Sequence, residues 1–207
     1  GWQFRTPDDD PHKFAFLGVR ACELAAMRVQ DRVFLSGPYV DPIYQQRRTQ
    51  ALIIAVNCTQ AASTCFCTSM GTGPKCTCGF DIALTELDEG FVVEAATSDG
   101  AEVVDALETS EATISQLQAA GVARHQAVEQ IERRLDTTDI RDLLLSNLEH
   151  PRWDDVARRC LSCTNCTMVC PTCFCSSVKE IGDLAGEHVQ RQRHWDSCFN
   201  FDFSYMN

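Results

Sequence analysis

The sequence has no long apolar run and no visible export signal. Its longest wholly apolar stretch covers residues 51–56, whereas a helix that crosses a bilayer needs about 20 apolar residues. A transmembrane helix is therefore excluded. Residues 1–14 contain neither the basic segment nor the apolar segment of a secretory signal peptide. We expect a cytoplasmic protein.

Positive charge is scarce as well. The chain has 18 Lys and Arg residues against 29 Asp and Glu residues, for a net charge of -11. A chain this acidic repels a phosphate backbone, which argues against nucleic acid as a partner. Two arginine pairs, Arg47-Arg48 and Arg158-Arg159, are better interpreted as solvated faces than as docking charges. The sequence shows no Ser–His–Asp set and no paired carboxylates, so we expect no catalytic site in this chain.

Cysteine, by contrast, is abundant, with 13 residues in 207. A secreted disulfide framework is normally shorter, carries a signal peptide, and avoids several cysteines two or three residues apart. Clustered thiols without an export signal favour metal binding over disulfides. The cysteines form two crowded groups, with one residue before the first group and one after the second: Cys22, then Cys58, Cys65, Cys67, Cys76 and Cys78, then Cys160, Cys163, Cys166, Cys170, Cys173 and Cys175, then Cys198.

The first part of the chain has an α/β pattern. A short apolar run predicts a buried strand over residues 14–19, and helical spacing of apolar residues follows over residues 22–34. Asp41-Pro42 predicts the start of a second helix. Residues 51–56 form the clearest strand, and a hairpin is expected over residues 82–96, with its turn at residues 88–90.

The second part has a mainly helical pattern from residue 99 to about residue 159. Gly121 is expected to separate two helices, residues 136–139 to cap the next one, and Pro151 to start a short helix that ends at Cys160. Residues 176–194 are also expected to be helical.

These patterns predict an α+β fold with two domains. Residues 1–98 would form an α/β cysteine-loop domain with a small mixed sheet, and residues 99–207 a helical, ferredoxin-like 4Fe–4S domain. The chain begins without Met and ends in the middle of a pattern, so we expect a segment of a longer polypeptide, truncated at both ends.

The second cysteine group contains the pattern C-x2-C-x2-C-x3-C-P without a mismatch. Two-residue spacings let the backbone curl around a cubane, and the fourth cysteine of this pattern binds the other cluster in two-cluster ferredoxins. A structural zinc site normally has two C-x2-C pairs separated by a dozen or more residues. The pattern therefore predicts a 4Fe–4S cluster at Cys160, Cys163, Cys166 and Cys170.

Three further thiols in this part, Cys173, Cys175 and Cys198, allow two interpretations. They could complete the cluster site, or they could pack beside it as small buried apolar groups. The missing ligands could also lie beyond residue 207.

The first cysteine group begins directly after the clearest strand, at the end where open α/β sheets place their sites. Cys22 follows the other predicted strand. If the two strands are parallel neighbours, Cys22 emerges at the same sheet edge as Cys58, and four thiols converge to hold a second cubane: Cys22, Cys58, Cys65 and Cys67. Two alternatives remain, a zinc-like site that uses Cys76 and Cys78, and a purely structural loop of buried thiols.

These residues resemble a known family, the beta (electron-transfer) subunits of soluble nickel–iron hydrogenases of the sulfhydrogenase type. The A subunit of anaerobic sulfite reductase belongs to the same group. The matching stretches cover most of the chain outside residues 100–150: residues 18–24, 30–34, Asp41-Pro42 with Tyr44 and Arg47-Arg48, Asn57-Cys58, 64–67, 69–74, 79–81, 160–175 and 195–198.

The resemblance implies a 4Fe–4S dicluster protein that relays electrons between a flavin/nicotinamide reductase subunit and the nickel–iron hydrogenase catalytic subunits. It places Cys160, Cys163, Cys166 and Cys170 in the family's first ferredoxin motif. Cys22, Cys58, Cys65 and Cys67 fall at its other recurrent cysteine positions, while Cys76 and Cys78 look like extras. The family's second C-x2-C-x2-C-x3-C-P motif, expected after residues 195–203, is absent here.

Two other functions use the same residues. The chain could serve an anaerobic sulfite or polysulfide reductase complex as its electron-transfer subunit, or it could be a redox-sensing iron–sulfur protein. The first differs only in its partner. The second lacks support from any recognisable output module, such as a DNA-binding helix pair.

Overall fold

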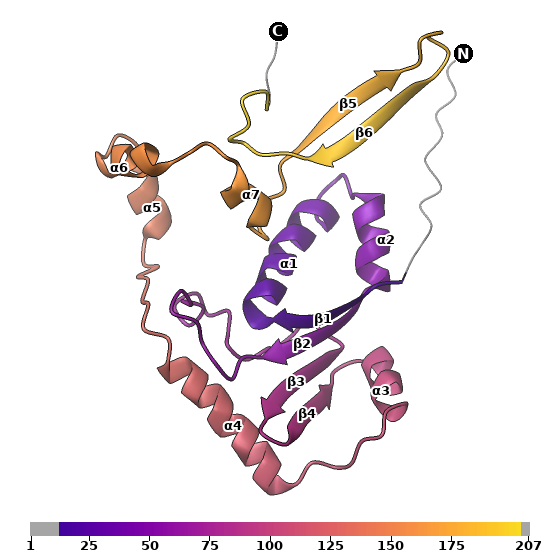
Figure 1. Ribbon diagram of the computed structural model, residues 1–207, viewed down its shortest axis with the longest axis vertical. Helices are drawn as coiled ribbons and strands as arrows, with labels where there is room; N and C mark the ends of the chain where they lie inside the picture. Colours follow the sequence, from indigo (N-terminus) through magenta and orange to yellow (C-terminus); the bar gives the residue numbers. More distant parts are fainter. Residues whose placement is uncertain (1–12, 204–207) are drawn as a thin grey trace. The chain divides into compact units, whose positions relative to one another are not determined.

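The computed structural model describes residues 13–203 (Figure 1). The chain divides into two compact units, residues 1–137 and residues 138–207. Over the described residues, no helix is long and apolar enough to cross a membrane. Most of the segment in which we looked for a signal peptide, residues 1–12, lies outside the described residues.

A four-stranded mixed sheet forms the centre of the first unit. The three strands β1, β2 and β3 are parallel, and β4 returns antiparallel to β3 through a tight turn at Gly90. The predicted strands, the predicted hairpin and the expected parallel pairing are all confirmed. The sheet order is β1 (Ala15–Arg20), β2 (Leu52–Asn57), β3 (Ile82–Leu87) and β4 (Gly90–Ala95).

Two helices accompany the first strands, α1 (Ala21–Leu35) and α2 (Pro42–Gln50). Leu24 of α1 packs with Val19, Ile53 and Ala55 of the sheet to form the main apolar cluster of this unit. Because such burial removes apolar surface from water, it fixes α1 to the first two strands. Asp41 caps α2 by accepting hydrogen bonds from the backbone of its first turn, as the sequence predicts.

A polar contact joins the two helices. Asp31 of α1 accepts hydrogen bonds from the Tyr44 hydroxyl at 2.7 Å and from the Arg48 guanidinium at 3.2 Å. Burial, together with this carboxylate, raises the pKa of Tyr44. Arg48 is therefore used inside the fold and is not a free docking charge.

A β-bulge adjusts the register of the first two strands. The pairing shifts between Leu17 and Val19, and Gly18 has φ +87°, a conformation that glycine adopts at little cost. After the bulge, Arg20 pairs with Val56. The two strands therefore end side by side.

The first unit also contains two helices that were predicted for the second domain. They are α3 (Ser98–Asp105) and α4 (Ile114–Glu129). The Asp81 carboxylate explains the position of α3: it accepts hydrogen bonds from the backbone of Ile53 and from Thr97, which caps the helix. Farther along, Arg124 of α4 donates to Thr85 of β3 at 3.4 Å. The compact units therefore divide about 40 residues later than the expected boundary, after Thr137 rather than near residue 98.

The expectation that Gly121 separates two helices is wrong. Helix α4 runs without a break through this position, and Gly121 has no positive φ. A glycine in a helix interior costs only about 1 kcal/mol relative to alanine. The buried residues Ala120 and Ala127 on α4 offset that cost by packing against the protein interior.

Over its described residues, 138–203, the second unit contains three short helices and one hairpin. The predicted short helix before Cys160 is confirmed as α6, but the helix expected over residues 176–194 is wrong, because this segment forms an antiparallel pair of strands. Asp183 and Gly186, the latter at φ +71°, build the turn between them. The elements are α5 (Ile140–Leu145), α6 (Arg152–Arg159), α7 (Asn165–Val169), β5 (Ser176–Gly182) and β6 (Val189–Trp195).

The second unit buries very little of its own surface. Among its described residues, 138–203, Ser197 alone is buried, with 2% of its surface exposed. An apolar core of the kind found in the first unit is therefore missing from this part of the described chain. Its fold depends on something other than the burial of apolar side chains.

Gly100 provides a test of the contact between α3 and Asp81. A Cβ atom at this position would lie 2.2 Å from the Asp81 carbonyl oxygen. Gly100→Ala should therefore lower the free energy of unfolding by about 1–3 kcal/mol, measured by urea denaturation with circular dichroism. Gly121→Ala is the matched control, because its Cβ meets no atom within 4 Å, and it should raise that free energy by about 0.5–1 kcal/mol. Equal effects of the two substitutions would contradict this packing.

Candidate metal centre

The first group of thiols gathers at the sheet edge that the paired ends of β1 and β2 create. Arg20 and Val56 are the last partners in the register, and Cys22 and Cys58 each follow two residues later. Cys22 lies in the first turn of α1, and Cys58 begins the loop after β2. The structure thus brings these two cysteines to one edge, as the parallel pairing predicts.

A charged pair shapes the same edge. The Glu23 carboxylate accepts hydrogen bonds from the Arg20 backbone at 2.8 Å and from its guanidinium at 2.6 Å. The guanidinium holds the pKa of Glu23 below its usual range. The Arg20 charge also acts on the Cys58 thiol, where it opposes the rise in pKa that burial causes.

Residues 58–75 form a loop that we call the cysteine loop, and its two ends are fastened together. The backbone of Cys58 donates to the carbonyl of Pro74 at 3.2 Å. The buried Asn57 side chain accepts from the Cys76 backbone at 2.8 Å and donates to Thr85 of β3 at 2.9 Å. A buried amide with both partners satisfied holds the base of the loop to the sheet.

Inside the cysteine loop, the backbone turns tightly around Cys67. Its carbonyl accepts hydrogen bonds from the backbone of Met70 at 3.2 Å and of Thr72 at 3.0 Å. Gly73 then passes close to the thiol: a Cβ at this position would lie 3.4 Å from the Cys67 sulfur and 3.1 Å from the Ala21 Cβ. The absence of a side chain at Gly73 lets its backbone pass this close to Ala21 and the Cys67 thiol.

Two of the four thiols predicted to hold a cluster, Cys58 and Cys67, have a pKa that the thiols near them raise. Burial raises the pKa of Cys58, and the neighbouring Cys22, Cys67 and Cys65 thiols raise it further, while Arg20 opposes them. Burial likewise raises the pKa of Cys67, together with Cys22 and Cys65. Such mutual effects require proximity, since charges act over only short distances in water.

The donor set fits an iron–sulfur cluster better than a single ion. Within residues 13–203, no three Cys, His, Asp or Glu side chains converge closely enough to hold one metal ion. The ligands of a cubane bind different irons and stand farther apart, and they are typically four thiolates. Cys22, Cys58, Cys65 and Cys67 provide four thiols and fit that chemistry.

Cys76 and Cys78 have different surroundings. Cys76 is 4% exposed, belongs to the apolar cluster under α1, and donates from its sulfur to the Val56 carbonyl at 3.5 Å. Burial raises its pKa to about 11. Cys78 is exposed and accepts a hydrogen bond from Arg28 at 3.4 Å. These positions suit a core residue and a surface residue better than a joint zinc site.

The second thiol group lies on a backbone that curls, as the motif requires. Helix α6 ends at Cys160, and Ser162 and Thr164 then adopt positive φ values of 50° and 63°. The Ser162 backbone N–H points to the Cys160 sulfur at 3.4 Å. The short helix α7 carries Cys166. Backbone N–H groups directed at sulfur stabilise a thiolate ligand and tune the potential of a cluster.

The three remaining thiols lie beside the motif. Cys170 approaches the Thr172 hydroxyl at 3.1 Å, and this hydrogen bond, followed by the Thr172 backbone, lowers its pKa. The Cys170 side chain in turn raises the pKa of Cys173. Burial raises the pKa of Cys198, and the Cys175 and Cys166 thiols act on it as well. Cys173 and Cys198 are therefore near enough to Cys170 and Cys166 for their charges to interact.

Polar contacts hold the segment around Cys198 against the ferredoxin motif. Thr167 of α7 donates to the hydroxyl of the buried Ser197. The Asp196 carboxylate accepts from Ser177 and Asn200 and from the Ser197 backbone, and these bonds lower its pKa to about 2. Hydrogen bonds thus replace apolar packing as the contacts between these segments.

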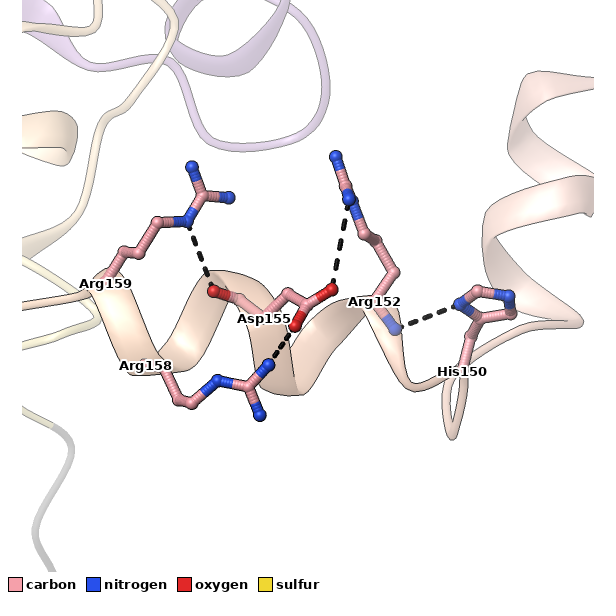
Figure 2. Close-up of polar contacts among 5 residues, drawn as sticks. All are labelled: His150, Arg152, Asp155, Arg158 and Arg159. Atoms are coloured by element: carbon pink, nitrogen blue, oxygen red, sulfur yellow. Dashed lines mark hydrogen bonds and ion pairs between the residues drawn. The ribbon is translucent and has the colours of Figure 1, made fainter.

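The arginines before Cys160 are partly neutralised within α6 (Figure 2). Asp155 pairs with Arg152 at 3.9 Å and with Arg158, and its carbonyl accepts from Arg159 at 3.2 Å. The backbone of Arg152 donates to the His150 ring at 3.1 Å. Since these arginine side chains are exposed and Asp155 offsets part of their charge, the arrangement fits the interpretation of a solvated face.

One set of contacts with the cysteine loop was not predicted from the sequence. The segment after α4 donates from Arg133 to the Ser63 carbonyl at 2.9 Å, and the Leu135 backbone donates to Ser69 at 3.0 Å. The partners are separated by 66 to 70 residues in sequence. No local pattern in the sequence could indicate such a contact.

Comparison with known proteins supports the iron–sulfur interpretation. Residues 159–207 match the family model of a 4Fe-4S dicluster domain. The protein named sulfhydrogenase 2 subunit beta, from Pyrococcus furiosus, is 34% identical over 196 residues, which cover 94% of this chain and 58% of the relative. The chain thus spans a little over half of that relative's length. The resemblance to sulfhydrogenase beta subunits is confirmed, and no solved structure matches the chain.

The difference between Cys76 and Cys78 can be measured by alkylation of the metal-free chain. Because Cys76 is buried and its pKa is about 11, iodoacetamide at pH 8 should modify Cys78 at least about tenfold faster than Cys76. Mass spectrometry of peptides from timed samples gives both rates. In urea the two rates should become equal, and equal rates without urea would show that Cys76 is not part of the core.

Proposed function

We propose that this chain, a relative of sulfhydrogenase beta subunits, is an iron–sulfur electron-transfer subunit. It relays electrons between a flavin/nicotinamide reductase subunit and the catalytic subunits of a nickel–iron hydrogenase. The observation that supports this most directly is the gathering of two separate thiol groups, one in each unit, on a chain related to such a subunit over 94% of its length. Two cluster sites in one chain are what a relay requires.

One cluster would be held in the second unit by the ferredoxin motif. Its ligands would come from Cys160, Cys163, Cys166 and Cys170, and the dicluster family match over residues 159–207 supports this assignment. The curled backbone at Ser162 and Thr164 is suited to wrap a cubane. Cys173, Cys175 and Cys198 follow the motif in the same unit and are the candidates for ligands that this motif does not provide.

A second cluster would be held in the first unit by Cys22, Cys58, Cys65 and Cys67. The parallel strand ends bring two of these thiols together, and the cysteine loop brings the other two. The Arg20 charge partly offsets the rise in the pKa of Cys58 that burial and the other thiols cause. Cys76 remains in the apolar core and supplies no ligand.

The chain's own side chains fit conduction better than catalysis. Iron–sulfur clusters transfer single electrons at potentials set by hydrogen bonds, charge and solvent exposure. The residues around both thiol groups provide these influences: a guanidinium at Arg20, a hydroxyl at Thr172 and a backbone N–H at Ser162. The Ser162 backbone N–H donates to the Cys160 sulfur, and hydrogen bonds of this kind tune the potential of an electron carrier.

Iron content provides the first test. Anaerobically purified protein, with its native partners present, should contain about eight iron and eight sulfide per chain, since each cubane contributes about four of each. Cys58→Ser and Cys160→Ser should each lower the iron content by about four. Cys76→Ser is the matched control and should leave it unchanged.

The other outcomes have distinct meanings. A content of about four iron, lost in Cys160→Ser and retained in Cys58→Ser, would reject the cluster in the first unit and leave a single electron site. Zinc in place of iron would reject electron transfer altogether. In the intact complex, addition of hydrogen should reduce the clusters, as seen by electron paramagnetic resonance, and a failure of both to be reduced would separate this chain from a hydrogenase.

A further inference from the structure

The segment directly after α4 contacts the cysteine loop along its length. We call residues 130–135 the brace. Gln130 accepts a hydrogen bond from the backbone of Ala61 at 2.8 Å, and Arg133 donates to the Ser63 carbonyl at 2.9 Å. Farther along, Arg134 donates to the Thr68 hydroxyl at 3.5 Å, and the Leu135 backbone donates to the Ser69 hydroxyl at 3.0 Å.

These contacts fall on both sides of two predicted ligands. Ala61 and Ser63 precede Cys65, while Thr68 and Ser69 follow Cys67. A loop fixed at points before and after a short segment has few conformations left for that segment. The brace therefore restricts the backbone that carries Cys65 and Cys67.

The brace is itself fixed to the sheet. Ile131, within the brace, is 2% exposed, and Ala127 in the preceding turn of α4 is fully buried. Helix α4 lies beside β3 and β4 (Figure 1), and its Arg124 donates to Thr85. Thr85 also accepts from Asn57 at the base of the cysteine loop. One side chain on β3 thus links the base of the loop with the helix that leads to the brace.

We propose that the brace is a positioning element for the cluster in the first unit, and that Arg133 also raises the potential of this cluster. The proposal rests on the proposed function, because it assumes that Cys22, Cys58, Cys65 and Cys67 hold a cubane. The brace touches no ligand sulfur. It acts through the backbone of the loop, so its residues are positioning residues.

The charge of the brace gives it a second effect. Arg133 and Arg134 place two guanidinium groups on the cysteine loop of a chain whose net charge is -11. Reduction adds an electron to a cluster, and a nearby positive charge stabilises the reduced form. Removing the charge should therefore make the cluster harder to reduce. A purely structural role would leave the potential unchanged.

The test uses the full chain in its native complex, with Arg133→Gln, Arg133→Lys and Ser69→Ala. The iron that is absent from Cys58→Ser is assigned to the cluster in the first unit. Arg133→Gln and Ser69→Ala should release this iron to a chelator about tenfold faster than wild type, the lower end of what loss of such supporting contacts costs. Arg32→Gln is the matched control, since it removes the same charge from an exposed position on α1 and should release iron at the wild-type rate.

The midpoint potential of the cluster distinguishes the positioning effect of the brace from the effect of its charge. In a redox titration followed by electron paramagnetic resonance, Arg133→Gln should lower the midpoint potential of the cluster in the first unit. Arg133→Lys, which retains the charge, should restore it, and Ser69→Ala should leave it unchanged. Amide hydrogen exchange in the metal-free chain should be faster at Ala61 and Leu135 in Arg133→Gln and Ser69→Ala than in Arg32→Gln.

Each result decides a different point. If wild type contains about eight iron and the brace variants match Arg32→Gln in iron release, exchange and potential, the brace proposal is wrong while the proposed function stands. If iron release changes and the potential does not, the effect of charge is rejected and positioning stands. If wild type contains only about four iron and Cys58→Ser loses none, the cluster in the first unit does not exist and both proposals fall.

Discussion

The parallel pairing of β1 and β2 is the constraint on which the first thiol group depends. A shift of a single residue in this register would move one strand end relative to the other by about 3.3 Å. The bulge at Gly18 sets the final pairing of Arg20 with Val56. Only with both strands ending together do Cys22 and Cys58 begin their segments side by side. The capping contact of Glu23, the cysteine loop and the brace all build on that edge.

The two units support their thiols by different physical means. The first has an apolar cluster around Leu24 and Ile53, and its cysteine loop is tied to a sheet through Asn57 and to a helix through the brace. The second has Ser197 as its buried residue among those described, and polar contacts at Asp196 connect its segments. A cluster in the first unit would occupy a site that the polypeptide already shapes. A cluster in the second would itself supply many of the contacts that hold the unit together.

The sequence predicts the features that arise from local patterns. Apolar runs identify β1 and β2, Asp41-Pro42 identifies the start of α2, and residues 88–90 identify the turn before β4. Their placement also predicts that Cys22 and Cys58 meet. The prediction of a helix over residues 176–194 was wrong. It rested on Lys, Glu, Gln and Arg, which are common in helices, but in this exposed hairpin the side chains of these residues face water. Neither the position of Gly121 inside a continuous helix nor the contacts of the brace could be predicted, because long-range packing decides both.

The nearly coreless second unit has a consequence for the life of the chain in a cell. The first unit has an apolar core of its own, whereas a cluster in the second unit would have to supply contacts that residues 138–203 lack. A shortage of iron or sulfide during synthesis would leave a chain that is folded at one end and open at the other. Open segments are the ones that proteases cut. If the proposed clusters are present, this architecture links survival of the newly made chain to their delivery, because a chain without clusters would be the more readily degraded.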